Sequence, residues 1–240
     1  MELAAGVIPA RYKSTRFPGK ALALIKGRPM IQWVYEAARE ARLLERVVVA
    51  TDDERIAAAC RGFGAEAVMT SPDLKSGTER VAEAIQVIDN NIVINIQGDE
   101  PLLSGGLIDR LVEALQDPAV RMASVMRREA DLALLANPNR VKVVVDKDGW
   151  ALYFSRSALP SGAADFFFQH VGIYGYRKDF LRQFCAWPPS RLERMERLEQ
   201  LRALENGVRI KMVETGHPAL SVDSPQDIIE VENFLNKKGR

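Results

Sequence analysis

Histidine and cysteine are scarce in this chain, which has two of each among its 240 residues. Two histidines are too few for a histidine-rich metal site. Nothing at the N-terminus resembles a signal peptide, so we expect a reducing cytoplasm, where Cys60 and Cys185 would be buried thiols rather than a disulfide. No apolar run approaches the ~18 to 20 residues that span a bilayer, and we therefore expect no membrane partner.

An excess of charge of one sign is also missing. Lys and Arg number 33 against 32 Asp and Glu, which leaves a net charge of +1. A chain so close to neutrality has no global field that would attract nucleic acid or an anionic membrane. Any anion must be bound by a local cluster of charge.

Three common site motifs do not occur. The chain has no Walker A pattern, no G-x-G-x-x-G fingerprint and no G-x-S-x-G elbow. These absences argue against a P-loop NTPase, a Rossmann dinucleotide site and a Ser-His-Asp hydrolase.

The pattern of strands and helices in the first half predicts an α/β fold. Short β-branched runs at 47–50 and 92–96 are typical of strands buried on both faces, and helical patterns lie at 29–41, 54–62 and 78–88. Alternation of strand and helix predicts a mostly parallel sheet flanked by helices. With 47% hydrophobic residues, we expect a single domain over 1–240.

The rhythm changes near Arg121, where a smaller β-rich subdomain is predicted at about 121–188. Strand-like runs lie at 141–145, 151–155 and 171–176, and the turn Asp146–Gly149 predicts a hairpin between the first two. Helices then resume, with a capping box at Ser190 and Glu193. An apolar stripe is expected at Leu192, Met195, Leu198 and Leu201.

The segment Pro9–Lys20 is the most informative stretch of the chain. It follows the apolar run 3–8, which we expect to be a strand that breaks at the proline, and carries four cations, two hydroxyls and a glycine in the pattern R-x-x-S-x-R-x-P-G-K. Exposed backbone N–H groups and cations at such a strand end suit a phosphate group. The alternative is a solvated basic loop.

Other predicted strands also end in polar residues. Thr51-Asp52-Asp53 is expected to be a helix cap and turn, Ser76 opens a helix, and Gln97-Gly98-Asp99 follows the run 92–96. Ligands of parallel sheets bind beyond the carboxyl ends of the strands, where these segments would meet the Pro9–Lys20 loop.

Asp99 and Asp223 are the candidate metal ligands. Mg²⁺ takes one or two carboxylates together with substrate oxygens and water. For Asp223 the alternative is an N-cap of the last helix, expected at 226–235. His170, beside a strand, would more usually be a hydrogen-bonded core residue, and His217 is expected in a loop.

The chain resembles the 3-deoxy-manno-octulosonate (Kdo) cytidylyltransferases, which are sugar nucleotidyltransferases. The likeness covers nearly the whole chain and rests on the ordered motifs IPARYKSTRFPGK, VVVATDDERIA, SGTERVAEAI, NIQGDEPL, VKVVVD, ALYFSR, HVGIYGYR, LERMERLEQLRALENG and SVDSPQDI. It implies a nucleotide-diphospho-sugar transferase fold, CTP and a sugar acid as substrates, Mg²⁺ as cofactor, a role in lipopolysaccharide biosynthesis and a homodimer formed through the β-rich region. The aromatic residues of that region, Phe166, Phe167, Phe168, Phe184 and Trp187, could equally be core.

The resemblance also implies a role for each residue that matches a family motif. It assigns the triphosphate to Arg11, Ser14, Arg16 and Lys20, with Lys20 and Arg16 stabilising the leaving pyrophosphate. It assigns the cytidine end to Ser76 and Arg80, the junction of sugar and nucleotide to Gln97, and magnesium to Asp99 and Asp223. The sugar acid would contact Arg156, His170, Tyr174, Glu199 and Gln200.

One segment departs from the family. Members usually carry a Trp or Phe and one or more Arg between the proline after ALYFSR and the histidine strand, whereas Pro160 is followed here by SGAADFFF. Either Arg156 and its neighbours bind the carboxylate, or the substrate is a modified acid such as an 8-amino analogue. The remaining alternatives are an enzyme for a sialic-type acid or a hexose 1-phosphate, and a nucleotide-binding regulatory protein without turnover.

Overall fold

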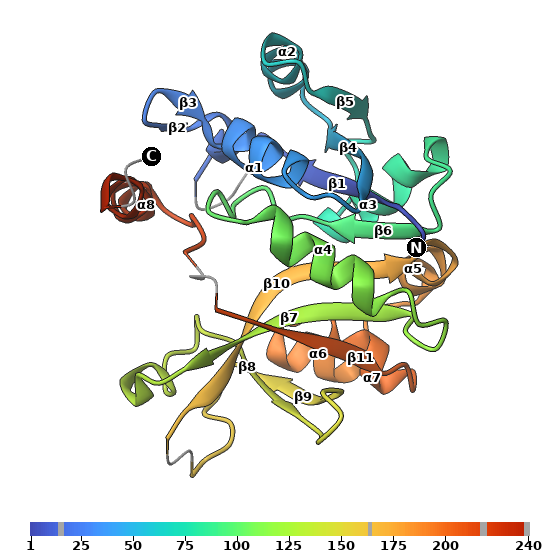
Figure 1. The fold of residues 1–240 in the computed structure, drawn as a ribbon, viewed down its shortest axis with the longest axis vertical. Helices are drawn as coiled ribbons and strands as arrows, with labels where there is room; N and C mark the ends of the chain where they lie inside the picture. Colours follow the sequence, from blue (N-terminus) through green and yellow to red (C-terminus); the bar gives the residue numbers. More distant parts are fainter. Residues whose placement is uncertain (14–16, 163–164, 217–219, 238–240) are drawn as a thin grey trace. The chain divides into compact units, whose positions relative to one another are not determined.

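The computed structural model describes residues 1–13, 17–162, 165–216 and 220–237. They form two compact units (Figure 1). We call residues 2–109 and 218–240 the N-terminal unit, and residue 1 with 110–217 the β-rich unit. The helix α4 (Gly105–Ala114) crosses the boundary in the sequence.

The N-terminal unit contains four parallel strands in the order β6-β1-β4-β5. They are β1 (Ala4–Ala10), β4 (Leu44–Thr51), β5 (Glu66–Met69) and β6 (Ile92–Asn95). The residues of β6 are all buried, as are most of β1 and the second half of β4. The prediction of an α/β fold with a mostly parallel sheet and flanking helices is confirmed.

β1 does not break at Pro9, as we had expected, but continues through it to Ala10. Proline lacks the N–H that a central strand donates to its neighbour. The ladder between β1 and β6 ends at Val7 and Asn95, so Pro9 pairs on one side only, with Ala50 of β4. At the proline, β1 therefore pairs with β4 alone, as an edge strand does, and this part of β1 lies at the carboxyl end of the sheet.

Three helices follow the strands of this unit, and their N-termini are set by short-range chemistry. α1 is Met30–Arg39, with Pro29 as its N-cap residue rather than its first helical residue as predicted. α2 is Glu54–Gly62, as predicted, and Asp53 caps it by accepting a hydrogen bond from the backbone of Arg55. α3 is Gly77–Ala84, followed by a 3₁₀ turn at Ile85–Val87.

The C-terminal helix α8 (Pro225–Lys237) belongs to the N-terminal unit and shares its core. Val231 and Leu235 pack in one buried cluster with Ile25, Met30 and Leu102. The remaining short elements are a 3₁₀ turn (Lys20–Leu22) and the hairpin of β2 (Leu24–Ile25) and β3 (Arg28–Pro29). The apolar run after Lys20 is thus divided between the 3₁₀ turn and β2.

The β-rich unit holds the other five strands. They are β7 (Met122–Glu129), β8 (Lys142–Val145), β9 (Ala151–Ser155), β10 (Phe167–Arg177) and β11 (Ile210–Thr215). β7 pairs in parallel with β11 and antiparallel with β10, and β8 pairs antiparallel with both β10 and β9. The predicted hairpin at Asp146–Gly149 is confirmed, with Gly149 at φ +76°.

The helices of this unit are α5 (Lys178–Ala186), α6 (Arg191–Glu196) and α7 (Leu201–Glu205), and a 3₁₀ turn covers Leu132–Leu134. The capping box of Ser190 and Glu193 is confirmed. The continuous stripe is wrong, because the helix ends at Glu196, Arg197 adopts φ +56°, and Met195 is 67% exposed while Leu198 and Leu201 are buried. Within the described residues, the helices are too short or too polar for any to cross a bilayer.

Both cysteines are free thiols, as expected. Cys60 is buried, and burial raises its pKa to about 11. Cys185 is only partly buried, contrary to expectation.

Candidate active site

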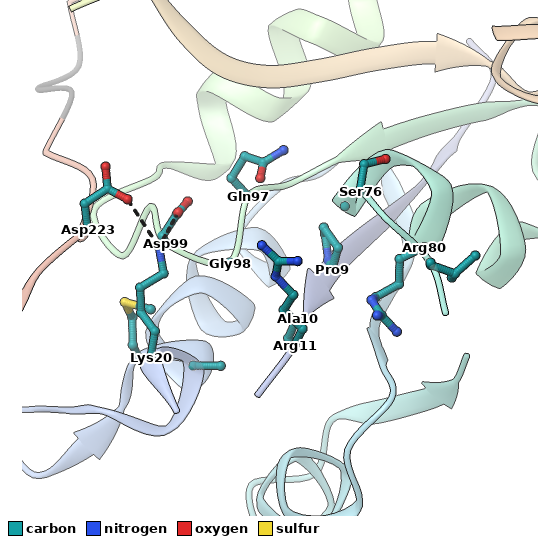
Figure 2. A pocket seen from close by; sticks show the side chains of 14 residues that line it. Pro9, Ala10, Arg11, Lys20, Ser76, Arg80, Gln97, Gly98, Asp99 and Asp223 are labelled. Atoms are coloured by element: carbon teal, nitrogen blue, oxygen red, sulfur yellow. Dashed lines mark hydrogen bonds and ion pairs between the residues drawn. The ribbon is translucent and has the colours of Figure 1, made fainter. Parts of the chain in front are cut away.

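A pocket of about 380 Å³ lies in the N-terminal unit at the carboxyl ends of β1 and β6 (Figure 2). Seven residues assigned from the sequence line it: Arg11, Lys20, Ser76, Arg80, Gln97, Asp99 and Asp223. In Figure 2, Ser76 and Arg80 lie at one end and Lys20, Asp99 and Asp223 at the other. The structure thus brings together residues from five separate segments of the chain. Ser14 and Arg16 lie outside the described residues.

Two glycines allow the walls of this pocket to approach Pro9. A Cβ on Gly98 would lie 3.0 Å from the carbonyl oxygen of Pro9, and one on Gly77 would lie 3.3 Å from its ring. Contacts this short leave little room for a side chain. The loop after β6 and the start of α3 can therefore close on the end of β1 only because both positions are glycine.

The two ends of the loop after β1 are joined by the hydrogen bond from Gly19 N–H to the carbonyl of Tyr12, at 2.9 Å. Gly19 adopts φ +72°, a conformation that favours glycine. The guanidinium of Arg55 stacks on the ring of Tyr12, 3.3 Å from its centroid, and Asp53 binds that guanidinium in turn. These contacts attach Tyr12, at the start of the loop, to the start of α2.

At the acidic end of the pocket, the ammonium of Lys20 lies between two carboxylates. Its Nζ is 2.7 Å from Asp99 and 3.6 Å from Asp223, and it also donates to the carbonyl of Val222 at 2.9 Å. Lys20 is largely buried, whereas the side chain of Asp223 is 46% exposed. A single cation therefore holds two carboxylates from distant parts of the chain in one place.

In the first turn of α8, Asp227 binds the residues that precede the helix. The carboxylate of Asp227 accepts hydrogen bonds from the backbone N–H groups of Asp223 and Ser224, at 2.8 and 2.7 Å. Although burial opposes ionisation of Asp227, these hydrogen bonds outweigh it and lower the pKa of its carboxyl. The Asp223 carboxylate faces Lys20, 3.6 Å from its ammonium.

The opposite end of the pocket is formed by the first turn of α3. Ser76 and Glu79 form a reciprocal capping box, in which the Ser76 hydroxyl accepts from Glu79 N–H at 3.1 Å. Arg80 is 3% exposed, and its guanidinium donates to Asp52 and Thr70. From the sequence, Asp52 was expected only as part of a cap and turn and Thr70 only as a polar residue at a strand end, because nothing local in the sequence pairs them with Arg80.

Apart from Gln97, the residues assigned to the sugar acid lie in the β-rich unit, and three of them form a buried cluster. His170, Tyr174 and Gln200 are each less than a tenth exposed. The hydroxyl of Tyr174 donates to Gln200 Oε1 at 3.2 Å, and the rings of His170 and Tyr174 lie 5.5 Å apart. Gln200 Nε2 is buried without a hydrogen-bond partner in the described structure, which leaves a donor for a ligand.

Ser124, which the sequence did not single out, is the hydrogen-bond partner of His170 Nε2. Its hydroxyl lies 2.9 Å from the carbonyl of Ile173 and 2.8 Å from His170 Nε2. A hydroxyl has one proton; if it goes to the carbonyl, Nε2 carries the imidazole proton and Nδ1 is an acceptor. Burial lowers the pKa of His170 to about 3, so the ring is neutral at physiological pH.

This arrangement depends on an irregularity in β10. Val171 pairs with Val125, but Tyr174 pairs with the next residue of β7, Ser124. Two residues of β10 therefore have no partner on β7, and the Ser124 hydroxyl binds a carbonyl freed by the bulge. A bulge of this kind was not visible in the sequence.

Arg156 and Glu199 make contacts of another kind. The guanidinium of Arg156 donates to the backbone carbonyls of Glu196 and Pro138, both at 3.0 Å. Glu199 lies 3.6 Å from the guanidinium of Arg202. Both side chains already have partners within the protein, so a ligand would have to share or replace those contacts.

The residues at the acidic end suit Mg²⁺ but not a closed protein site. Among the described residues no group of three or more His, Cys, Asp and Glu side chains could hold a metal ion. Two carboxylates beside a polyanion pocket are the donor set that Mg²⁺ uses when substrate phosphates and water complete its coordination. Asp99 and Asp223 fit that description.

Comparison with known proteins adds the family. Residues 5–210 match the cytidylyltransferase family. The 3-deoxy-manno-octulosonate cytidylyltransferase of Geobacter sulfurreducens is 50% identical, covering 94% of this chain and 96% of its own, and that of Thermodesulfovibrio yellowstonii is 44% identical, covering 96% and 97%.

Solved structures agree. A CMP:2-keto-3-deoxy-manno-octonic acid synthetase complexed with CTP has a TM-score of 0.94 and 40% identity, covering 98% of this chain and 99% of its own. A 4-diphosphocytidyl-2C-methyl-D-erythritol synthase from Anaerococcus prevotii, with a TM-score of 0.68 and 12% identity, shares the fold alone. The chain belongs to the 3-deoxy-manno-octulosonate cytidylyltransferases of the cytidylyltransferase family.

Proposed function

We propose that this protein is a cytidylyltransferase that forms CMP-Kdo and pyrophosphate from CTP and Kdo. The observation that carries the proposal is the pocket at the ends of β1 and β6, where Lys20 lies between Asp99 and Asp223. Relatives that are named for this reaction, and a structural neighbour complexed with CTP, support it. The product would supply lipopolysaccharide biosynthesis in the cytoplasm.

In this reaction the anomeric hydroxyl of the sugar acid attacks the α-phosphorus of CTP, and the bond to the bridging oxygen of the β-phosphate breaks. Little covalent chemistry falls to the protein, so catalysis consists mainly of positioning and charge neutralisation. Arg11, Ser14, Arg16 and Lys20 would bind the triphosphate. Lys20 and Arg16 would then neutralise the pyrophosphate as it leaves.

Asp99 and Asp223 would hold Mg²⁺. When bound, the ion would neutralise phosphate charge and lower the pKa of the attacking hydroxyl. The ammonium of Lys20 now lies between the same two carboxylates. A triphosphate that enters the pocket would offer Lys20 another anionic partner. If the Lys20 ammonium moves to the phosphates, the two carboxylates become free to bind the metal.

The nucleotide base would lie at the other end, beside Ser76 and Arg80, and Gln97 between the two ends would contact both substrates. His170, Tyr174, Glu199, Gln200 and Arg156 would bind the sugar acid. The neutral His170 ring offers an acceptor and Gln200 a donor, which suits the hydroxyl groups of a sugar. Arg156 remains the proposed partner of the carboxylate.

The test is the release of pyrophosphate from each of the four NTPs with Kdo, 8-amino-Kdo and a sialic acid, with and without Mg²⁺. We expect release with CTP and Kdo in the presence of Mg²⁺. Preference for 8-amino-Kdo would assign the unusual segment after Pro160 to substrate choice. Binding of CTP without release for any acid would support a regulatory protein instead.

A further inference from the structure

A buried ion pair lies beside the end of the pocket that we assign to the nucleotide base. Arg80 NH2 is 3.1 Å from the carboxylate of Asp52, and the two side chains are 3% and 15% exposed. Arg80 lines the pocket itself, whereas Asp52 is not among the lining residues. Asp52 therefore reaches the pocket through its ion pair with Arg80 rather than by lining it.

The same guanidinium is held by the end of a neighbouring strand. Arg80 NH1 donates to the hydroxyl of Thr70 and lies 3.4 Å from the carbonyl of Ser71. Ser71 N–H in turn donates to Glu83 of α3 at 2.8 Å. Residues that directly follow β4 and β5 thus attach α3 to the sheet at two points along the helix.

The position of Arg80 on α3 connects this network to the pocket wall. Arg80 N–H bonds to the carbonyl of Ser76 at 3.3 Å, one helical turn earlier, and Ser76, Gly77 and Arg80 all line the pocket. Gly77 packs closely against Pro9, because a Cβ on Gly77 would lie 3.3 Å from the proline ring. A small displacement of the first turn of α3 would change the shape of this wall.

A buried guanidinium needs a compensating charge in order to stay in place. Breaking a buried pair by removing one partner is far more damaging than removing an exposed pair, because it leaves an uncompensated charge in a site that excludes water. Without the carboxylate of Asp52, Arg80 would turn toward water or toward the triphosphate in the pocket. Either movement would take the guanidinium away from the end of the pocket that we assign to the nucleotide base.

We infer that Asp52 is a positioning residue for the nucleotide. It holds the Arg80 guanidinium and the first turn of α3 in the arrangement that receives the nucleoside end of CTP, and Thr70 assists it. This inference rests on the proposed function, since it deepens the role of that same pocket. It assigns Asp52 no contact with either substrate.

The experiment compares Asp52→Asn with the wild-type enzyme by steady-state kinetics for both substrates and by competition between CTP and UTP. We expect the KM for CTP to rise about tenfold or more and the preference for CTP over UTP to fall by a similar factor, while the KM for Kdo changes less than about twofold. If Asp52 had a purely structural role, the substitution would lower the amount of active enzyme and leave both the KM for CTP and the preference for CTP over UTP unchanged.

Glu66→Gln is the matched control. Glu66 on β5 pairs with Arg46 on β4, so the variant also removes a carboxylate from an arginine across these two strands, but the pair is exposed and outside the pocket. We expect wild-type KM values and an unchanged CTP preference. If Asp52→Asn does not fold, Thr70→Val keeps the charge pair and should move the same two quantities in the same direction by a smaller factor.

The inference is overturned if the folded Asp52→Asn enzyme keeps the wild-type KM for CTP, or if both KM values rise together. With Thr70→Val as the only folded variant, an unchanged KM for CTP overturns it equally. Failure of the proposed function is a different result, in which the wild-type protein releases no pyrophosphate from CTP and Kdo.

Discussion

Lys20 illustrates at the scale of single residues how the charges of the pocket are arranged. Its ammonium lies 2.7 Å from Asp99 and 3.6 Å from Asp223, which otherwise would repel each other. The cost of this arrangement is that the protein's own cation competes with a metal ion for the same carboxylates. Metal binding and phosphate binding should therefore be coupled.

Replacing Lys20 with Met tests this coupling directly. Without the ammonium the two carboxylates are free, so we expect the affinity for Mn²⁺ in the absence of nucleotide to rise about tenfold or more, as measured by electron paramagnetic resonance. Lys147→Met, which removes a cation that is 90% exposed in the β-rich unit, should leave the affinity unchanged. Equal Mn²⁺ affinities of Lys20→Met and wild type would mean that Lys20 does not compete with the metal.

Buried His170 makes a prediction about pH. Because burial lowers its folded pKa to about 3, below the ordinary value of about 6.5, the unfolded chain takes up the proton first as the pH falls. His170 therefore contributes a loss of stability that grows from about pH 6.5 down to about pH 3, with a slope approaching ~1.4 kcal/mol per pH unit.

His170→Gln removes this titration. Between pH ~6.5 and ~5, we expect the unfolding free energy of the wild type to fall by about 2 kcal/mol more than that of the variant. Urea denaturation at each pH measures both values. Parallel stability curves over that range would show that His170 titrates normally in the folded protein.

Arg156→Lys separates a binding role from a structural one. The guanidinium donates to the carbonyls of Glu196 and Pro138, and an ammonium cannot reproduce that planar geometry. We expect the unfolding free energy to fall by about 1 to 2 kcal/mol and the KM for Kdo to rise about tenfold, with little change for CTP. A loss of stability at an unchanged KM for Kdo would leave Arg156 a structural residue, with the carboxylate bound elsewhere.

At the scale of elements, the ends of helices and strands carry most of the site. α3 presents its capped first turn to the pocket, and the segment before α8 presents Asp223. Two acidic residues four positions apart have different contacts at the start of α8, where Asp227 binds the backbone N–H groups of Asp223 and Ser224, and Asp223 faces Lys20.

That difference predicts opposite phenotypes for two neighbouring variants. Asp227→Ala should lower the unfolding free energy by about 1 kcal/mol, with any loss of activity following the loss of folded protein. Asp223→Asn should leave the melting temperature nearly unchanged and reduce kcat by several orders of magnitude. Thermal denaturation and kinetics on the same samples check both, and an Asp223→Asn enzyme that keeps more than about a tenth of wild-type kcat would exclude Asp223 from metal binding.

At the scale of the whole molecule, the residues assigned to the nucleotide and most of those assigned to the sugar acid belong to different units. The β-rich unit also exposes apolar side chains, including Leu152 at 60% on β9 and Met195 at 67% on α6. Of the aromatic residues that we considered for an interface, Phe167 and Phe184 are buried core. Exposed apolar residues are more suitable candidates for an interface between copies.

We expect a homodimer through the β-rich unit, and light scattering at micromolar concentration should give twice the mass of one chain. Leu152→Glu should shift that mass toward the monomer, because it places a charge in an apolar contact. Phe168→Leu, at a partly buried aromatic, serves as the control and should remain dimeric. A monomeric wild-type protein would contradict the prediction.

The sequence by itself determined the parallel α/β fold, the β8–β9 hairpin, the caps at Ser190 and Asp53, and most of the pocket. These features depend on periodicity, on turn and capping residues a few positions apart, and on motifs whose order matches a known family. Hydrophobic patterning alone placed the ends of β1 and β6, and with them Lys20 and Asp99, at one edge of a sheet.

Only the tertiary structure decided which side chains meet across long distances in the chain. Asp52 and Thr70 around Arg80, Ser124 beside His170, the two backbone carbonyls that bind Arg156 and Asp223 beside Lys20 all depend on contacts that no local pattern encodes. The expected stripe from Leu192 to Leu201 was wrong for a related reason. The helix stops where Glu196 binds Ser155, the last residue of β9, and the backbone of Arg156 that follows it, and this tertiary contact overrides the helical periodicity of the sequence.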